Sequence, residues 1–527
     1  MSDETLQSRL ADFGWFSERF FSIRDSKAKI IPFQMNPLQE ILHRNLFGFD
    51  DILKARKGGV STYVVLWMLH YVLIHPNARA MILAHDHRSS RTLFQIAKTA
   101  YKHLPAQMKP AVDIDNQQEM RFAHLGSSIS VSTARNADIG RGDTIDVLHC
   151  SEIAFWEKPE ATMTAVSGAL GENAVVFRES TANGAGTYWH KQWVRGKNRQ
   201  SGYRPHFFPW WIDTKYRADD PNPVKDPLEF DAEQNRLPLV PTEKEKSLPI
   251  DEEQIRWRRR MVDRFRSKFS QEFAENDTEC FLTSGHAVFD NVMMSSLFER
   301  LYANKERVLK EIPELGLKIF WLPTTKREQM QAEYVIGADT AEGLHDEDDP
   351  NSPGDFSTAT VIECRTGHMA ATVHGNWTPD EFAYVLSDVA KLFATPHAGL
   401  PLLGVERNEY GHATLNQLRH AIQYPNVYHE VVYDQEKQSS IRKPGWRTSP
   451  QTRPIMITDL VRATNQGYLK ITDPDFVGEC LTFVKNRRGR PEAQTGCHDD
   501  RVISAAIAWQ MTQHAGMSAP LTGINLP

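Results

Sequence analysis

A short run of glycines, basic residues and hydroxyls near the start of the chain has the groups needed to bind a nucleotide phosphate. The run comprises Arg56, Lys57, Gly58, Gly59, Val60, Ser61 and Thr62. Glycines allow backbone N–H groups to face a phosphate, a basic side chain offsets its charge, and a hydroxyl can hold Mg²⁺. The usual order GxxxxGK[ST] is not kept, because Val60 stands where a lysine normally precedes the hydroxyl. By itself the run therefore fits either a nucleotide-binding loop or a plain glycine-containing turn.

Carboxylates in the second half of the chain could perform metal-dependent cleavage of a phosphodiester. Asp339 and Glu406 each follow an apolar run typical of a buried strand, and Asp499 and Asp500 precede a helical pattern. Two-metal cleavage requires several carboxylates to meet at one point, usually from strand ends and a helix. A helix N-cap explains Asp499 taken alone, whereas no cap explains Asp339 or Glu406. Asp355, near the start of a predicted hairpin, is a candidate outer metal ligand.

Two basic segments are candidates for contacts with nucleic acid. The segment 485–490 fits either sequence-independent phosphate contacts or a plain surface hairpin. A basic stripe at helical spacing in 255–269, on a different side from an apolar stripe, favours a solvated helix face over a DNA contact. The candidate DNA-binding residues are Lys485, Arg487, Arg488 and Arg490.

The first 215 residues alternate apolar runs with amphipathic stretches, which is typical of an α/β domain with a parallel sheet. The expected strands are 80–84, 129–132, 144–150 and 173–177, and a helix is expected over 89–103. A second alternation runs from 334 to 514, with strands expected at 334–339, 356–363, 369–374, 402–406 and 480–484. The predicted domains are 1–215, a Pro-rich and charged connector at 216–325, a second α/β domain at 326–514, and a mobile tail at 515–527.

Composition excludes several classes of protein. A net charge of -6 over 527 residues argues against a histone-like binder, and five scattered cysteines with no CxxC pair indicate neither a disulfide framework nor a zinc site. The longest apolar run, residues 63–74, contains His70 and is too short to span a bilayer. The acidic first residues lack the features of a secretory signal, so we expect the protein to act in the cytoplasm.

Taken together and in order, these motifs resemble those of the large terminase subunits of tailed bacteriophages, over roughly residues 33–510. The glycine-containing run resembles the deviant Walker A motif of that family, in which the basic residue lies in the front half of the loop. The loop residues that this resemblance assigns are Arg56 or Lys57 for the phosphates, Ser61 or Thr62 for Mg²⁺, and Gly58 and Gly59.

The resemblance extends to motifs on both sides of the loop. Gln39, in Asn36-Pro37-Leu38-Gln39, would read the adenine edge, and residues 147–152 resemble a Walker B strand. There Ser151 replaces the usual aspartate; a serine can hold a metal-bound water but supplies no charge. Glu152 would orient or deprotonate the attacking water, although a glutamate at a helix start is the alternative. The remaining implied residues are Arg141 as an arginine finger, and Ser180, Thr181 and Asn183 in the coupling motif.

In the second half, the order of strand with Asp339, further strands, strand with Glu406 and helix with Asp499 or Asp500 resembles an RNase H-like nuclease. The predicted fold is therefore a P-loop ATPase domain of the additional-strand (ASCE) class with a parallel sheet, followed by an RNase H-like domain with a mixed sheet. The implied cofactors are ATP and Mg²⁺, with Mn²⁺ able to substitute in the nuclease site.

The resemblance also implies a function: ATP-driven movement of viral double-stranded DNA into a prohead and endonucleolytic cutting of the concatemer. The implied partners are DNA, the portal protein, a small terminase subunit and further copies of the chain in a pentameric ring. No membrane is involved. The site of action would be the cytoplasm of the infected bacterium, and the protein would be absent from the mature virion.

Two other interpretations remain open. The first is a resolvase-like or transposase-like nuclease whose degenerate N-terminal domain no longer turns over ATP, which the departures at Val60 and Ser151 permit. The second is a structural ATP-binding protein without nuclease action. Magnesium-dependent ATP hydrolysis would exclude the first, and metal-dependent nicking of plasmid would exclude the second.

Overall fold

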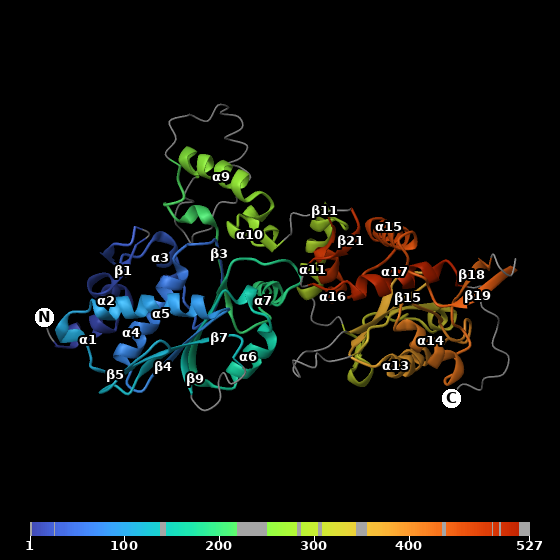
Figure 1. The fold of residues 1–527 in the computed structure, drawn as a ribbon, viewed down its shortest axis with the longest axis horizontal. Coiled ribbons are helices and arrows are strands. Elements are labelled where there is room, and N and C mark those ends of the chain that lie inside the picture. Colours follow the sequence, from blue (N-terminus) through green and yellow to red (C-terminus); the bar gives the residue numbers. More distant parts are fainter. Residues whose placement is uncertain are drawn as a thin grey trace. The chain divides into compact units, whose positions relative to one another are not determined.

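The computed structural model divides the chain into two compact units, Met1–Ser284 and Gly285–Pro527 (Figure 1). The division falls inside the segment 216–325 that the sequence sets apart as a connector. The structure describes residues 3–25, 27–136, 144–218, 250–281, 286–303, 308–343, 356–434, 439–486, 489–494 and 497–515. Within these ranges no helix is both long and apolar enough to cross a membrane.

Unit 1 is built on an eight-stranded sheet of order β10-β3-β9-β8-β4-β7-β6-β5. Its elements are α1 (Asp3–Ala11), α2 (Phe13–Phe20), β1 (Ser22–Arg24), β2 (Ile30–Pro32), α3 (Pro37–Arg44), β3 (Phe49–Lys54), α4 (Val60–Ile74), β4 (Arg79–Ala84), α5 (His87–Lys102), β5 (Val112–Asp115), β6 (Glu119–Phe122), β7 (Ser128–Thr133), β8 (Ile145–Ser151), α6 (Pro159–Ser167), β9 (Leu170–Ser180), α7 (Tyr188–Lys197), β10 (Arg204–Phe208), α9 (Glu252–Phe265) and α10 (Phe269–Glu272).

The six strands from β10 to β7 are parallel, and β6 and β5 extend them as antiparallel edge strands. The predicted parallel sheet is thus confirmed, with an antiparallel extension that the sequence analysis did not anticipate. β9 lies between β3, which leads into the glycine-containing loop, and β8. This inserted strand is the feature that defines the additional-strand class of P-loop ATPases.

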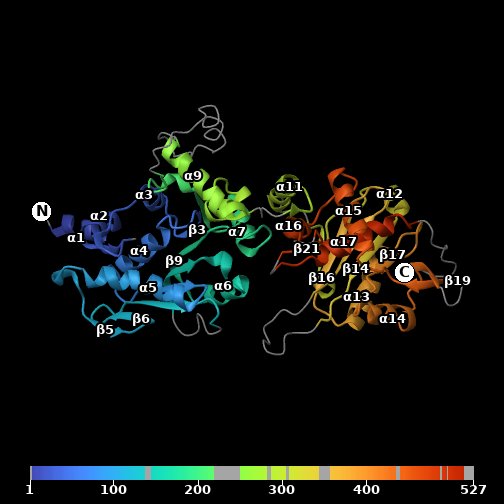
Figure 2. The same ribbon diagram turned by 45° about the horizontal axis from the view of Figure 1, so that its top comes forward.

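The helices of unit 1 differ in how they meet the sheet. α4 and α5 lie side by side (Figure 2). α4 is apolar nearly all round and is buried along most of its length, whereas α5 buries only its apolar stripe. The core around them continues into α9 and α10, since Trp257, Phe269 and Phe273 belong to the same apolar cluster. The helix expected over 255–269 therefore packs on unit 1, and it ends earlier than expected, at Phe265, because Arg266 adopts a positive φ.

Unit 2 contains a six-stranded mixed sheet of order β12-β13-β16-β15-β14-β17. Its elements are β11 (His286–Ala287), α11 (Asn291–Ala303), β12 (Lys310–Ile312), β13 (Leu317–Ile319), α12 (Lys326–Gln331), β14 (Tyr334–Asp339), β15 (Ser357–Glu363), β16 (Met369–Gly375), α13 (Pro379–Leu392), β17 (Leu402–Val405), α14 (Gly411–His420), β18 (His429–Asp434), β19 (Ser439–Pro444), α15 (Thr452–Asn465), α16 (Pro474–Thr482), β20 (Phe483–Lys485), β21 (Pro491–Ala493) and α17 (Asp500–Thr512).

Only the pair β14 and β17 is parallel in this sheet, and the other neighbours are antiparallel. This is the strand arrangement of an RNase H-like domain, so the predicted mixed sheet is confirmed. One expected strand is wrong: residues 480–482 close α16, and only Phe483–Lys485 form a strand. Cys480 and Leu481 are buried on the apolar face of that helix, and a short buried apolar run does not distinguish helix from strand.

Two glycines allow α17 to lie flush against the sheet. A Cβ added to Gly337 of β14 would lie 2.1 Å from the backbone nitrogen of Ala508, and one added to Gly404 of β17 would lie 2.6 Å from Met511 Sδ. Hydrogen bonds to β15 keep the helix from sliding along its axis. Thr358 Oγ1 donates to the Asp500 carbonyl at 2.9 Å, and the Thr360 and Ser504 hydroxyls are 3.0 Å apart. The helix that begins with Asp500 is therefore held in one position on β14 and β15.

Candidate functional site

The first candidate site lies where β3, β9 and β8 end side by side. Ligands of open α/β sheets bind at the carboxyl ends of parallel strands. The glycine-containing loop follows β3 and leads into α4, with Gly59 at φ +83° as the N-cap. A Cβ on Gly59 would lie 2.8 Å from Gln39 Nε2, so both the backbone angle and the close neighbour require glycine there.

The start of α3 holds this loop from one side. Gln39 Nε2 donates to the Gly59 carbonyl at 2.7 Å, and Asn36 Nδ2 donates to the Gly58 carbonyl at 3.1 Å. Asn36 and Gln39 also cap α3 reciprocally. The predicted adenine-reading residue therefore lies beside the loop, with its amide engaged by the loop backbone.

The basic residues of the loop point away from the buried end of β3. Arg56 is 54% exposed and contacts Glu272 Oε2 of α10 at 3.1 Å. Lys57 is exposed and has φ +62°. Ser61 and Thr62 lie in the first turn of α4, where hydroxyls can face a bound ion. The structure thus brings the Ser61 hydroxyl to the buried end of β9 and leaves both predicted phosphate ligands at the surface.

A buried glutamate organises the hydroxyls of this site. Glu179 Oε1, at the end of β9, accepts hydrogen bonds from Ser61 Oγ at 2.7 Å and from Ser151 Oγ at 2.8 Å. His149 Nε2 lies 3.3 Å from the same oxygen. Loop, β8 and β9 therefore meet at one carboxylate oxygen.

Lys54 lies between two carboxylates and carries their counter-charge. Its Nζ is 2.7 Å from Glu152 Oε1 and 3.1 Å from Glu179 Oε2, and the Lys54 side chain is 5% exposed. Burial alone would lower the pKa of Lys54, but the two carboxylates outweigh burial and raise it. For Glu179 the effects have the opposite sign. Burial alone would raise its pKa, but Lys54, together with the His149 and Ser61 contacts, holds that pKa well below its usual range. Lys54 and Glu179 are therefore both ionised at neutral pH.

Glu152 does not act as a helix cap. It precedes the short 3-10 helix Ile153–Phe155 with φ +52° and makes no side-chain cap hydrogen bond. Its Oε2 instead accepts from Ser180 Oγ at 3.2 Å and from the backbone N–H of Thr181 at 3.4 Å. A left-handed backbone at a non-glycine residue is strained, and such strain concentrates at functional sites. The predicted coupling residues Ser180 and Thr181 thus touch the predicted water-orienting glutamate.

Asn183 lies one step further from this site. Its Nδ2 donates to the Ala154 carbonyl at 2.9 Å, and its Oδ1 accepts from Gln271 Nε2 at 3.4 Å. Gln271 belongs to α10, so the segment after β9 is connected to the same helix that Arg56 contacts.

The second candidate site lies at the ends of β14 and β17 in unit 2. The ladder between these strands extends past β17, because the Glu406 backbone N–H donates to the Ala338 carbonyl at 2.8 Å. Asp339 therefore ends its strand beside Glu406. Asn408 Nδ2 donates to Glu406 Oε2 at 2.8 Å, which fixes the orientation of that carboxylate. Neighbouring parallel strands thus deliver two acids to one edge of the sheet.

Asp339 is electrostatically coupled to the other predicted acids. Burial raises the pKa of Asp339 well above its usual range, and Glu406, Asp500 and Asp499 raise it further, in that order. A buried carboxyl surrounded by like charge keeps its proton. The start of α17 therefore lies close enough to Asp339 for the acids of both elements to interact electrostatically.

The N-cap explanation of Asp499 is wrong. Asp499 occupies the N-cap position but makes no side-chain cap hydrogen bond; its Oδ2 accepts from Arg453 of α15 at 2.6 Å. Glu479 of α16 caps the helix instead, accepting from the N–H groups of Arg501 at 2.8 Å and Val502 at 3.3 Å. Because Glu479 comes from a separate element, the local sequence could not reveal this cap.

The basic segment connects β20 and β21, which pair antiparallel. The Asn486 N–H donates to the Arg490 carbonyl at 2.8 Å, and Lys485 and Arg490 are exposed. The structure does not assign either of them to DNA. Four predicted site residues fall outside the described ranges: Arg141, Asp355, Arg487 and Arg488.

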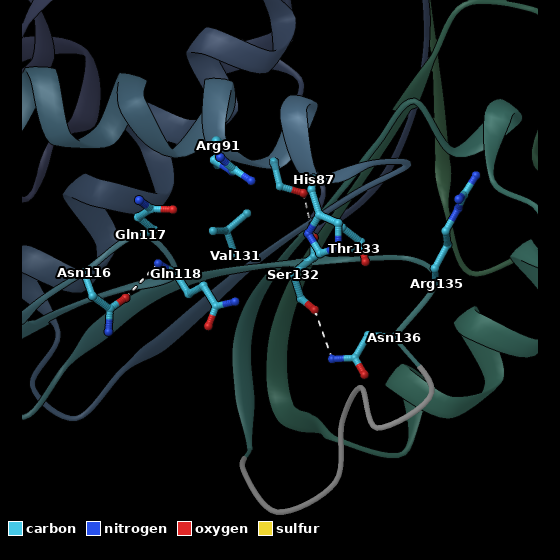
Figure 3. A pocket seen from close by; sticks show the side chains of 11 residues that line it. His87, Arg91, Asn116, Gln117, Gln118, Val131, Ser132, Thr133, Arg135 and Asn136 are labelled. Atoms are coloured by element: carbon cyan, nitrogen blue, oxygen red, sulfur yellow. Dashed lines mark hydrogen bonds between the residues drawn. The ribbon is translucent and has the colours of Figure 1, made fainter.

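A hollow of about 650 Å³ opens at the β7 end of unit 1 (Figure 3). Arg91 of α5 and Arg135, just after β7, both line it, together with the polar turn that begins at Asn116. Asn136 Nδ2 donates to Ser132 Oγ across its wall at 3.3 Å. None of the site residues predicted from the sequence lines this hollow.

Three residues of these sites were missed by sequence reasoning. Lys54 is the last residue of β3, and Glu179 lies near the end of β9, where Arg178 separates it from the apolar run; the signal at both is therefore weaker than at Asp339 and Glu406. Asn408 carries no such signal, because its role depends on a contact with Glu406. Within the described ranges, no three His, Cys, Asp or Glu side chains are gathered tightly enough to ligate one ion. The carboxylate and hydroxyl oxygens of both sites are nevertheless hard donors of the type that Mg²⁺ prefers.

No family model matches the chain. Among solved structures it is similar to the large terminase of bacteriophage HK97, at 12% identity over 96% of this chain and 99% of that one, with a TM-score of 0.47. It is similar to the ATPase domain of the Thermus phage P74-26 large terminase (14% identity, 46% and 94% coverage, TM-score 0.32). It is also similar to the magnesium-bound large terminase nuclease of thermophilic phage G20c (16%, 43% and 97%, 0.30). The structural neighbours of this chain are thus large terminases of several bacteriophages.

Proposed function

We propose that the chain is a DNA-packaging motor, a large terminase subunit that hydrolyses ATP in unit 1 and cuts DNA in unit 2. The observation that carries the proposal is the presence of two separate acid sites, each at the ends of neighbouring parallel strands. One surrounds Lys54 behind a glycine-containing loop, and the other surrounds Asp339 beside a helix. An ATP-binding module alone would leave the second site without a purpose.

In the ATPase site the chain's own residues would divide the work. The loop from Arg56 to Gly59 would bind the phosphates, and Ser61 would face the magnesium ion that accompanies ATP and neutralises its charge. Glu152 would orient and deprotonate the attacking water. Its contacts with Ser180 and Thr181 give the coupling segment a direct means of sensing the state of that carboxylate.

In the nuclease site Asp339, Glu406 and Asp500 would hold Mg²⁺ or Mn²⁺, which would supply an activated water and stabilise the leaving oxygen. Asp500 is the better candidate than its neighbour, because Asp499 is paired with Arg453. Lys485 and Arg490 could contribute contacts to the phosphate backbone, which fit an enzyme that cuts without reading sequence.

The wider proposal follows the motif order described above. Docked on a portal as a pentameric ring, the subunit would draw double-stranded DNA into a prohead and cut the concatemer. A small terminase subunit would choose the starting site. The work would be done in the cytoplasm of the infected bacterium, and the protein would not remain in the mature virion.

The test is plasmid cleavage with Mg²⁺ or Mn²⁺ by the wild-type chain and by Asp339→Ala, with ATP turnover recorded on the same samples. We expect the variant to lose cleavage and to keep ATP turnover. Asp388→Asn, an exposed acid of α13 in the same unit, is the matched control and should cut normally. Cleavage by Asp339→Ala at the wild-type rate would overturn the nuclease assignment. Cleavage without any ATP turnover by the wild type would favour the resolvase-like alternative.

A further inference from the structure

The Walker B strand of unit 1 lacks the aspartate that normally helps to hold the nucleotide's magnesium ion. Ser151 stands in that place at the end of β8. A hydroxyl can hold a metal-bound water but cannot offset the charge of a divalent ion, and hard divalent cations are usually bound with one or two carboxylates. The site therefore needs a carboxylate from another element.

Glu179 is the carboxylate that the fold brings to this place. β8 and β9 are parallel neighbours whose register pairs Ser151 directly with Glu179. Ser61, which faces the magnesium ion in the proposed function, and Ser151 both donate to the same oxygen, Glu179 Oε1. No part of the Glu179 side chain is exposed, and a buried charge in such a place must have a partner.

Lys54 provides that partner when no metal is bound. Its ammonium lies 3.1 Å from Glu179 Oε2 and 2.7 Å from Glu152 Oε1. Lys54 ends β3, Glu179 lies at the end of β9, and Glu152 directly follows β8. These three strands are neighbours, and ligands of such sheets bind at this edge. The carboxylate is thus kept ionised and ready to offset a divalent cation.

We propose that Glu179 supplies the magnesium-holding carboxylate of the ATPase site, moved from the Walker B strand β8 to the neighbouring strand β9. Ser151 and Ser61 orient Glu179, and Lys54 preserves its charge in the metal-free site. This inference rests on the proposed ATP-binding function and assigns within it a metal-site role to a residue outside the usual motif.

The experiment measures the affinity for a fluorescent ATP analogue in Mg²⁺ and in EDTA, and the affinity for Mn²⁺ by electron paramagnetic resonance with nucleotide present. We expect the wild type to bind the analogue more tightly with Mg²⁺. Glu179→Gln should lose that gain and bind Mn²⁺ about 10- to 100-fold more weakly. Glu172→Gln, an exposed glutamate at the opposite end of the same strand, is the matched control and should behave as wild type.

A double variant keeps the test decisive if Glu179→Gln alone fails to fold. Ser151→Asp with Glu179→Gln returns one carboxylate to β8, still within the cluster around Lys54, and should restore magnesium-dependent binding. Unchanged metal affinity in folded Glu179→Gln, or no restoration in the folded double variant, would overturn this inference and leave the ATPase proposal standing. Failure of the wild type to bind the nucleotide would instead overturn the ATPase function and, with it, the role of Glu179.

Discussion

The two acid sites of this molecule manage buried negative charge in opposite ways. In unit 1, Lys54 forms ion pairs with Glu152 and Glu179 and lowers the pKa of Glu179, so the Glu179 carboxylate stays ionised without a metal. In unit 2, Asp339 lies among further acids and retains a proton, because burial and like charge raise its pKa. A metal ion that enters the first site meets the charged carboxylate of Glu179, whereas one that enters the second must displace a proton from Asp339. The comparison teaches that sites of similar composition can have opposite responses to pH and metal.

The largest expected effect separates the chemistry of the two units. Glu152→Gln should lower ATP turnover by about 10²- to 10⁴-fold, the usual contribution of a general base, while metal-dependent cleavage of plasmid persists. Turnover and cleavage are measured on one preparation, with Glu172→Gln as the control. ATP turnover by Glu152→Gln at the wild-type rate would return this glutamate to a purely structural role.

Removing the ammonium group of Lys54 tests the charge compensation in unit 1. Lys54→Met should destabilise unit 1 by about 3 to 5 kcal/mol at neutral pH, since it leaves the buried carboxylate of Glu179 and the partly exposed one of Glu152 without their lysine partner. The pKa of Glu179 is depressed in the folded state, so the stability it contributes is present above its unfolded pKa and is lost as pH falls. Urea unfolding at pH 7 and pH 4 should therefore show the smaller loss at pH 4. Equal losses at the two values would contradict the charge-balance explanation.

The two aspartates at the start of α17 should differ in their contribution to metal binding. Asp500→Asn should weaken Mn²⁺ binding to the nuclease site about 10- to 100-fold, a typical cost of altering a metal site. Asp499→Asn should cost less, because its carboxylate is engaged by Arg453. Calorimetric titration of both variants gives the comparison. A larger loss in Asp499→Asn would reverse the assignment.

The smallest expected effect concerns pH and stability in unit 2. The unfolded Asp339 ionises near its ordinary pKa, whereas the folded one keeps its proton to higher pH, so the metal-free unit loses stability as pH rises between those values. Asp339→Asn should remove this loss. Mg²⁺ at about 10 times its dissociation constant should add roughly 1.4 kcal/mol to the wild type, with a larger gain at pH 8 than at pH 5. Thermal unfolding at both pH values measures it, and a metal gain that is independent of pH would contradict the prediction.

Site residues could be predicted from the sequence where the residues next to them in the chain identified them. Alternation and strand-end acids predicted both sheets and placed Asp339 and Glu406 at one edge, because an acid directly after a buried run has few structural explanations. The same rule does not single out Lys54, which is not an acid, or Glu179, which Arg178 separates from the apolar run before it. Their importance in the proposed ATPase site depends on contacts between neighbouring strands, which the local sequence does not encode.

Contacts between distant segments could not be predicted in this way. The cap of α17 comes from Glu479, 21 positions before Asp500, and frees Asp499 to pair with Arg453. The end of α9 at Phe265 depends on the backbone angle of Arg266, which apolar periodicity does not encode. The helical residues 480–482 belong to a short buried run whose conformation is set by its packing.

Gly337 and Gly404 affect the spacing of the carboxylates in the proposed nuclease site. α17 packs directly on the backbone of β14 and β17, because Gly337 and Gly404 have no Cβ to hold it away. The distance between Asp500 of α17 and Asp339 of β14 therefore depends on these two glycines. A single methyl group at Gly337 would lift the helix and open the carboxylate set without altering any ligand. The dimensions of the proposed metal site, and hence its preference between a small cation and a larger one, would therefore depend on Gly337 of β14 and Gly404 of β17.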